Sequence, residues 1–408
     1  MSLLGFFSLA KLRAAALVAP LVVVVGCGRD EAPAAPPPLT GCAALLSTCL
    51  ADQKSCVEDA AGDARCEACA VGQYAADSGQ CEAIGGSPLA HDFETFTVEP
   101  GVEIEGLCQS WTLGNATEIW VNAVELEQDV ASHHSNWTFV PSDQFEGPDG
   151  IWSCAARGYN QVTAALSGGV IYAQSTQAPR EVQKFPAGVA VRIPPYSRII
   201  GDVHLLNTGD EPVTGHSKLT IYGVPAADVA HKLVPFHLTY TGLAIPPHAK
   251  SRFYGECDVS FSYSAALKRP LDQQVYYILP HTHAMASRFF LEIMGGPRDG
   301  ETIVDLSGFN GEAHGRVFPT PVDMRGAEGY RFGCEYDNPR DETVSWGFGD
   351  QEMCELLGFA EADAGFESKV TYAENVGSDG DVQLFTSLCS TLAFVWDHDK
   401  PGGPPPQP

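Results

Sequence analysis

The sequence has 408 residues, of which 44% are hydrophobic, and its 51 acidic and 24 basic side chains give a net charge of −27. A chain with this much apolar material can bury real cores, and its length allows two to three domains. The strong negative charge repels nucleic acid and anionic lipid headgroups, so we expect no nucleic-acid partner.

Residues 1–26 have the pattern of an export signal. Lys11 and Arg13 precede the apolar run AAALVAPLVVVVG, which is short for a membrane span. The run ends in VVGC, which resembles a bacterial lipobox and implies cleavage before Cys27 and lipid attachment to its thiol. An ordinary signal peptide with an incidental cysteine is the alternative. We expect an exported bacterial lipoprotein on the periplasmic or cell-surface face, in contact with the membrane through its lipid anchor only.

Residues 27–41 are rich in Pro and Ala, which predicts an extended tether. The segment 42–85 is too short for a self-sufficient apolar core and predicts a small disulfide-held module of open connectivity. The motif CEAC at 66–69 could be a redox pair or half a zinc site, but the segment has no βαβ pattern and no histidine, which favours structural disulfides. The cysteines of this module are Cys42, Cys49, Cys56, Cys66, Cys69 and Cys81.

From about residue 90 onward the sequence has the pattern of an all-β protein. Short apolar alternations such as TEIWVNAVEL and KLTIYGV are bounded by turn residues, and long helical periodicities are few. A second β-rich stretch begins near Pro235. We therefore expect one β domain at 90–234, a second at 235–398, and a disordered tail at 399–408 that ends in PGGPPPQP.

Five histidines are candidate metal ligands. His281 and His283 lie in the strand-like run YYILPHTHAMASRFF, so they share one face, where a metal ion would remove the repulsion between two imidazoles. The alternative is one core and one solvent-facing histidine. His133 and His134 are adjacent, so both can bind one ion only at a bulge or a strand end. His204, near the end of a strand, would by itself be a core histidine.

Met353 stands beside Cys354 in the Gly-flanked acidic stretch GFGDQEMCELLGF. A lone methionine is usually a core residue. A thioether close to imidazoles, however, is a soft ligand that favours Cu(I).

The order HH, VH, HTH and EMC over two β-rich halves resembles the copper type II, ascorbate-dependent monooxygenases, the family of peptidylglycine α-hydroxylating monooxygenase and dopamine β-monooxygenase. The resemblance covers roughly residues 92–398. It implies two tandem jelly-roll-like antiparallel β-sandwiches that each hold one copper across a solvent-filled cleft. The electron-storing copper would be bound by His133, His134 and His204. The catalytic, O2-activating copper would be bound by His281, His283 and Met353.

The same resemblance implies three disulfides and a reductant. The disulfides would pair Cys108 with Cys154, Cys257 with Cys389, and Cys334 with Cys354. Ascorbate or an equivalent one-electron donor would reduce the two coppers.

The resemblance is incomplete at the positions that bind a substrate carboxylate in the peptide-amidating members. These positions are Leu279, Glu355 and Leu357 in this sequence, and they cannot pair with a carboxylate. We therefore reject a glycine-extended peptide as substrate and expect an amine or a neutral apolar molecule. Asp202 and Asp350 lie near the proposed ligands and are candidate acceptors for imidazole N–H groups.

The sequence thus predicts a dicopper monooxygenase that hydroxylates a small organic substrate at carbon with O2 and a reductant. Two alternatives stay open: an O2-reducing copper oxidase, and a non-catalytic copper-binding or surface-binding lipoprotein on the same fold. The oligomeric state and the identity of the substrate are not indicated by the residues.

Overall fold

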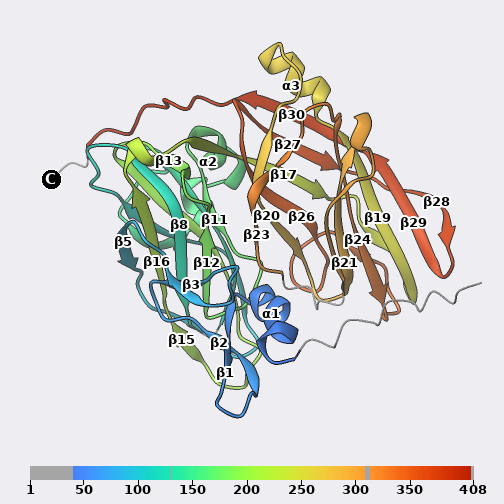
Figure 1. Cartoon of the computed structure of the whole chain (residues 1–408), viewed down its shortest axis with the longest axis horizontal. Helices are drawn as coiled ribbons and strands as arrows, with labels where there is room; N and C mark the ends of the chain where they lie inside the picture. Colours follow the sequence, from blue (N-terminus) through green and yellow to red (C-terminus); the bar gives the residue numbers. More distant parts are fainter. Residues whose placement is uncertain (1–39, 130, 308–312, 406–408) are drawn as a thin grey trace, which may run out of the picture. The chain divides into compact units, whose positions relative to one another are not determined.

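Strands make up most of the chain and stack in two sandwiches (Figure 1). The computed structural model describes residues 40–129, 131–307 and 313–405. The predicted signal peptide, the lipidation site Cys27 and nearly all of the tether lie outside these residues. The described residues from Gly41 onward belong to one compact unit.

The first half combines a five-stranded sheet with one end of an eleven-stranded sheet. The five-stranded sheet has the order β10 (Gly150–Ser153), β7 (Glu103–Thr112), β14 (Ser197–Leu206), β9 (Ser132–Pro141) and β11 (Gly169–Ala173). The first half's strands in the larger sheet are β13 (Val189–Ile193), β8 (Ile119–Gln128), β16 (Ser217–Val224) and β5 (Ser87–Asp92), with β12 (Arg180–Lys184) on β8. Large apolar side chains such as Trp137 and Phe139 are buried in the core of this half.

The second half combines a six-stranded sheet with the other end of the eleven-stranded sheet. The six strands are β22 (Thr302–Ser307), β21 (Ala286–Met294), β24 (Gly329–Asn338), β19 (Ala249–Asp258), β29 (Val382–Leu388) and β28 (Glu374–Asp379). The strands of the larger sheet are β23 (Arg316–Asp323), β20 (Gln274–Thr282), β26 (Cys354–Glu361), β17 (His231–Tyr240), β27 (Ala364–Val370) and β30 (Ser390–Val395). Phe253, Phe289 and Phe236 are buried in one apolar cluster between these sheets.

Shorter elements complete the fold. The helices are α1 (Cys42–Ala51), α2 (Gln161–Ser167) and α3 (Ser260–Leu267). The two-stranded pairs are β1 (Lys54–Glu58) with β2 (Ala64–Ala68), β3 (Gln73–Ala75) with β4 (Cys81–Ala83), β6 (Phe96–Val98) with β15 (Val213–Gly215), and β18 (Ala244–Ile245) with β25 (Val344–Ser345). Most pairings are antiparallel, but β13 with β17, β17 with β27 and β19 with β29 are parallel. The predicted fold class, two jelly-roll-like sandwiches after a disulfide-rich module, is confirmed.

The two halves are continuous at the junction. Strand β17 spans the predicted boundary between residues 234 and 235, pairing with β13 of the first half at His231 and Lys232 and with β26 from Leu233 onward. The boundary therefore falls inside a strand. Strands of both halves are therefore joined by backbone hydrogen bonds within one sheet.

The Cys-rich module is held by bridges between its own cysteines. They join Cys42 to Cys56, Cys49 to Cys66 and Cys69 to Cys81. The two cysteines of CEAC therefore have different partners, as structural disulfides require. The structure also forms the three bridges that the resemblance implied, which pair Cys108 with Cys154, Cys257 with Cys389, and Cys334 with Cys354.

A buried charged pair fixes the module against the first half. Glu125 is fully buried in β8, and its carboxylate lies 2.5 Å from the Arg180 guanidinium and accepts the Gly72 backbone N–H at 3.1 Å. Arg180 also donates to the Cys69 carbonyl at 3.3 Å. A buried ion pair is tolerated where further hydrogen bonds satisfy both partners, and here the module supplies them.

The described part of the C-terminal segment, residues 399–405, contacts the first half. Arg192 donates to the Lys400 carbonyl at 2.9 Å, and the Ser142 hydroxyl donates to the Pro404 carbonyl at 2.7 Å. A proline-rich segment has few N–H groups, but its extended carbonyls remain available as acceptors. These contacts form because donors of the first half lie within reach, and the disordered tail at 399–408 stays a prediction.

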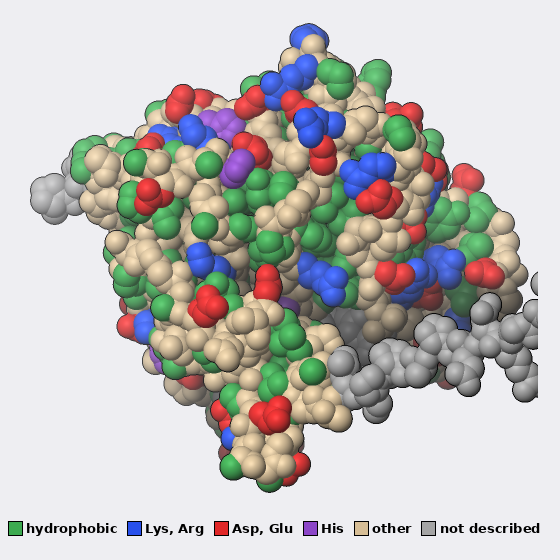
Figure 2. Space-filling model, viewed as in Figure 1, with side chains coloured by type: hydrophobic (Ala, Val, Ile, Leu, Met, Phe, Trp, Pro, Cys, Tyr) green, Lys and Arg blue, Asp and Glu red, His purple; other side chains and the backbone are tan. Residues whose placement is uncertain are grey.

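Charged groups are mixed on the face shown in Figure 2, where acidic and basic side chains alternate with hydrophobic ones. Ion pairs join many charged side chains of the described chain, and Arg288, for example, lies 2.7 Å from Asp305 and 2.8 Å from Glu335. Within the residues that the structure describes, no helix combines the length and the apolar character needed to cross a membrane.

Candidate metal centre

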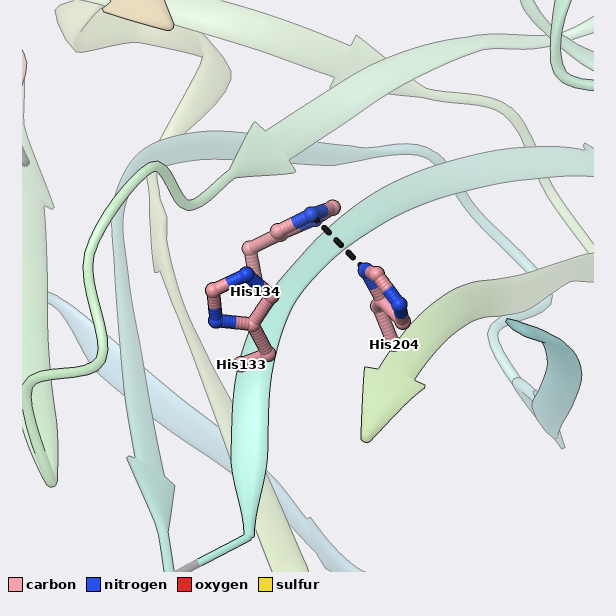
Figure 3. Close-up of side chains that lie close together, drawn as sticks. All are labelled: His133, His134 and His204. Atoms are coloured by element: carbon pink, nitrogen blue, oxygen red, sulfur yellow. Dashed lines mark hydrogen bonds between the residues drawn. The ribbon is translucent and has the colours of Figure 1, made fainter. Parts of the chain in front are cut away.

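The first histidine set, His133, His134 and His204, lies where strands β9 and β14 meet (Figure 3). His204 and His134 are directly opposite each other in the antiparallel ladder, and the pairing becomes irregular immediately after His204. This irregular end lets two adjacent residues approach the same partner, as binding by an HH pair requires. The ring centroid of His204 is 5.1 Å from that of His133 and 4.7 Å from that of His134.

The ring nitrogens of this set are only partly satisfied. Nδ1 of His204 lies 2.9 Å from Nε2 of His134. Nε2 of His204 is 2.8 Å from a Glu103 carboxylate oxygen, but the contact lacks the direction of a hydrogen bond. Nδ1 of His133 is buried without a hydrogen-bond partner. The set therefore keeps nitrogen atoms available for a ligand.

The second set, His281, His283 and Met353, comes from a strand end and two loops. His281 lies near the end of β20, and His283 follows in the turn before β21. Nδ1 of His283 donates to the Gln351 carbonyl at 2.8 Å, which leaves its Nε2 buried without a partner. Nδ1 of His281 lies 3.0 Å from the hydroxyl of Ser175, a buried residue of the first half.

Glu352 joins the two segments of the second set. Its carboxylate is buried and accepts the backbone N–H groups of His283 at 3.0 Å and Met285 at 2.7 Å. Burial raises the pKa of Glu352, and these backbone donors oppose that shift. Because Glu352 directly precedes Met353, it connects the turn that carries His283 to the loop that carries the thioether.

Met353 is itself buried, and it lines one cavity together with His134 and His281. Its carbonyl accepts the Tyr336 hydroxyl at 2.7 Å, which fixes the backbone at this point. Met353 therefore lines the cavity that the imidazoles of His134 and His281 also line.

The two sets meet, which the resemblance did not imply. The ring centroids of His134 and His281 are 5.0 Å apart, and nitrogen atoms of His134, His281 and His283 lie within 4.8 Å of one another. The expected separation across a solvent-filled cleft is therefore absent between these described residues. The physical reason is that the halves pack directly: Leu279 and Phe359 of the second half are buried in the first half's core.

Burial keeps the imidazoles of His133, His134 and His281 neutral. It lowers the pKa of His133 to about 4, and it lowers the pKa of His281 to about 3, with the neighbouring histidines adding to both shifts. The pKa of His134 lies well below its ordinary value for the same reasons. Neutral imidazoles keep a lone pair, so near pH 7 the cluster can bind a metal ion without first losing protons.

The carboxylate beside the first set is Glu103. Together with Glu105 it forms a further potential metal-binding group around His204. The predicted acceptors have other partners: Asp202 accepts from Gln161 at 2.8 Å, and Asp350 lies 3.5 Å from Arg340. These two predictions were wrong because a strand far away in sequence, β7, brings Glu103 closer to His204 than either aspartate.

Sequence reasoning missed the residues that orient the ligands. Ser175, Gln351, Glu352 and Glu103 contact the imidazoles or their backbone, but they carry no recognisable spacing relative to the histidines. The one available signal was Glu352, a carboxylate directly beside the candidate ligand Met353. Phe348, in the same loop, lies 6.0 Å from His204 between ring centroids and covers that imidazole.

The positions that differ from the amidating enzymes line the same cavity, whose volume is about 520 Å³. Glu355 accepts the Thr239 hydroxyl at 2.9 Å and the Trp346 indole N–H at 3.1 Å, and it lies 3.6 Å from His237. Burial opposes its charge, but the pairing with His237 outweighs burial and lowers the pKa of Glu355 to about 2. Glu355 is therefore an ionised and paired group.

No protein-family model and no curated protein matches the sequence. Among solved structures, the chain is similar to the major capsid protein P2 from bacteriophage PM2, with 8% identity over 67% of this chain and 97% of that one, at a TM-score of 0.26. It is also similar to the cowpea mosaic virus top component, a naturally occurring empty particle (9% identity, 66% and 89% covered, TM-score 0.31). A third similar structure is the PBSX exported protein XepA, with 9% identity over 75% of this chain and 98% of that one, at a TM-score of 0.18. Similarities at these TM-scores carry no argument about ligands or activity.

Proposed function

We propose that the protein is an exported, lipid-anchored dicopper monooxygenase that hydroxylates a small organic substrate at carbon, using O2 and ascorbate or an equivalent one-electron reductant. The observation that carries this proposal is the convergence of five imidazoles from both halves beside the cavity that Met353 lines. One copper would be held by His133, His134 and His204. The other would be held by His281, His283 and Met353.

Copper fits the chemistry of these donors. Nδ1 of His133 and Nε2 of His283 are buried and lack hydrogen-bond partners, and such atoms are costly to bury unless they bind a ligand. Imidazole suits copper, and the Met353 thioether favours the cuprous state. The low pKa values of His133 and His281 keep their lone pairs free near neutral pH.

When bound, the two coppers would supply the electrons and the O2 chemistry that hydroxylation of a C–H bond needs. The chain's own residues orient the ligands. The Gln351 carbonyl selects the tautomer of His283 that leaves Nε2 free, Ser175 holds the His281 ring, and Glu352 fixes the backbone that carries His283. Phe348 shields His204 from solvent on one side.

The decisive test measures copper per chain, reductant-dependent O2 uptake and hydroxylated product in parallel. We expect two coppers per chain, with one lost in His204→Ala and the other weakened in Met353→Ala. His216→Ala is the matched control, because this histidine is exposed, pairs with Asp129 and belongs to none of the histidine groups described above.

The alternatives give different outcomes in the same experiment. O2 uptake without hydroxylated product would identify an oxidase. Two bound coppers without O2 uptake would identify a copper-binding protein, and fewer than two coppers in the parent chain would overturn the dicopper proposal.

A further inference from the structure

One wall of the cavity beside the second set is formed by paired residues of strands β20 and β26. Strands β20 and β26 place His281 opposite Glu355 and Leu279 opposite Leu357. Directly opposed residues, and residues two apart on one strand, lie on the same face of a sheet. The two leucines therefore form the row next to His281 on the face that lines the cavity.

Further apolar side chains surround this leucine row. The cavity has a volume of about 520 Å³, within the range of roughly 300–1,000 Å³ typical of small-molecule sites. Its apolar lining includes Met353, Trp346, Phe348, Phe366, Phe394 and Leu166. Residues of both halves contribute, so the cavity is complete only in the assembled chain.

The two carboxylates in the wall that belong to β26 and β14, those of Glu355 and Asp202, already accept hydrogen bonds. Glu355 receives hydrogen bonds from Thr239 and Trp346 and faces His237. Asp202 receives one from Gln161 at 2.8 Å. Lys369 and Glu367 carry opposite charges on the same face of β27, two residues apart. A charged ligand would have to displace the partners of Glu355 or Asp202, or separate the offsetting charges of Lys369 and Glu367, whereas a neutral ligand would leave these groups as they are.

We propose that this cavity binds a neutral small molecule with an apolar body, which lies over Leu279 and Leu357 and presents a carbon toward His281 and Met353. The inference rests on the proposed function for what happens to that carbon. The binding preference itself depends only on the wall of the cavity.

The test compares three probes of equal ring size on the full chain, in EDTA and again with copper: neutral 2-naphthol, cationic 2-naphthylmethylamine and anionic 2-naphthoate. Binding is followed by calorimetry. We expect 2-naphthol to bind at least about tenfold more tightly than either charged probe, because Glu355 and Asp202 are already hydrogen-bonded and the opposite charges of Lys369 and Glu367 offset each other. Tightest binding of the amine or of the carboxylate would overturn the proposal.

Variants locate the binding. Leu357→Ala should weaken 2-naphthol binding several-fold, and Leu279→Arg should shift the preference toward 2-naphthoate. Leu89→Ala, at an exposed position on β5, is the matched control and should change nothing. If Leu279→Arg does not fold, Leu357→Ala still decides, and 2-naphthol affinity unaltered by Leu357→Ala would place the probe elsewhere and overturn the proposal.

The EDTA measurement separates the two proposals. Preferential 2-naphthol binding in a chain that shows no turnover with copper would sustain this inference and remove the proposed function. Hydroxylation by a copper-loaded chain that binds the amine most tightly would support the proposed function and overturn this inference.

Discussion

The two candidate ligand sets are held by different means. In the first half, His134 and His204 lie on paired strands, so the backbone ladder between β9 and β14 sets their separation. In the second half, His283 and Met353 lie outside the regular strands and depend on the side chain of Glu352 and the carbonyl of Gln351. In the first half many backbone hydrogen bonds together fix the positions of the imidazoles. In the second half the position of the ligand-bearing loop depends mainly on one carboxylate.

This difference indicates which substitutions should displace the candidate ligands of each set. Altering a side chain near the first set leaves the strands paired, so the remaining imidazoles keep their places. Altering the support of the second set releases the backbone that carries a ligand. His134 is the exception, because it belongs to both groups of nitrogen atoms.

Replacing His134 should have the largest effect. We expect His134→Ala to weaken copper binding at the first site by at least about 100-fold, since direct ligands matter more than the outer partners whose loss costs about 10–100-fold, and to weaken the second site by a smaller factor because His134 packs against His281. His133→Ala should affect only the first site. Copper titration of both variants checks this, and full retention of the second copper in His134→Ala would show that the two sets are independent.

Replacing Glu352 should have an intermediate effect, confined to the second site. Glu352→Gln puts an amide N–H₂ group against a backbone N–H donor and loses one hydrogen bond, a change of about 1–3 kcal/mol, or roughly 5- to 150-fold in affinity. Calorimetric copper titration measures it. Glu374→Gln on the exposed strand β28 is the control, and equal weakening at both sites would mean that Glu352 supports the fold generally.

Acidification of the metal-free chain should have the smallest effect. His133 and His281 have pKa values of about 4 and about 3 when folded, against an ordinary value of 6.5, so below pH 6.5 the unfolded chain binds more protons than the folded one. Stability should therefore fall as the pH falls, by about 1.4 kcal/mol from these two histidines between pH 7 and pH 6, and the lowered pKa of His134 adds to the fall. Urea unfolding in EDTA measures this.

A doubly substituted chain, His133→Gln with His281→Gln, tests the origin of that pH dependence. It should lose most of the dependence, whereas His216→Gln should retain it, because His216 is exposed. A pH dependence that is the same in all three chains would assign the effect to other groups.

The sequence predicted the fold class because alternation of apolar residues directly reflects which strand face is buried. It also identified His133, His134 and His204 as a set, and the structure brings these residues together. Local pattern carries this information, since an HH pair needs a bulge or a strand end, and β9 begins at Ser132, directly before the pair.

What the sequence could not predict depends on packing between distant segments. Ser175 reaches His281, and Glu103 reaches His204, only because the halves and sheets pack as they do. The contact between His134 and His281 has the same origin. The C-terminal segment was predicted to be disordered because its composition cannot form a helix or a strand alone. Composition does not show which hydrogen-bond donors of other segments lie beside it.

The shared core has a consequence for how this protein could change over generations. Tyr276, Leu279 and Phe359 are encoded with the second half but pack in the apolar cluster of the first. Neither half could therefore be transferred alone into another protein. Either half by itself would expose part of that apolar cluster to water, and the exposed surface would favour association. A descendant could gain or lose one metal site only by substitution in place, with both halves retained.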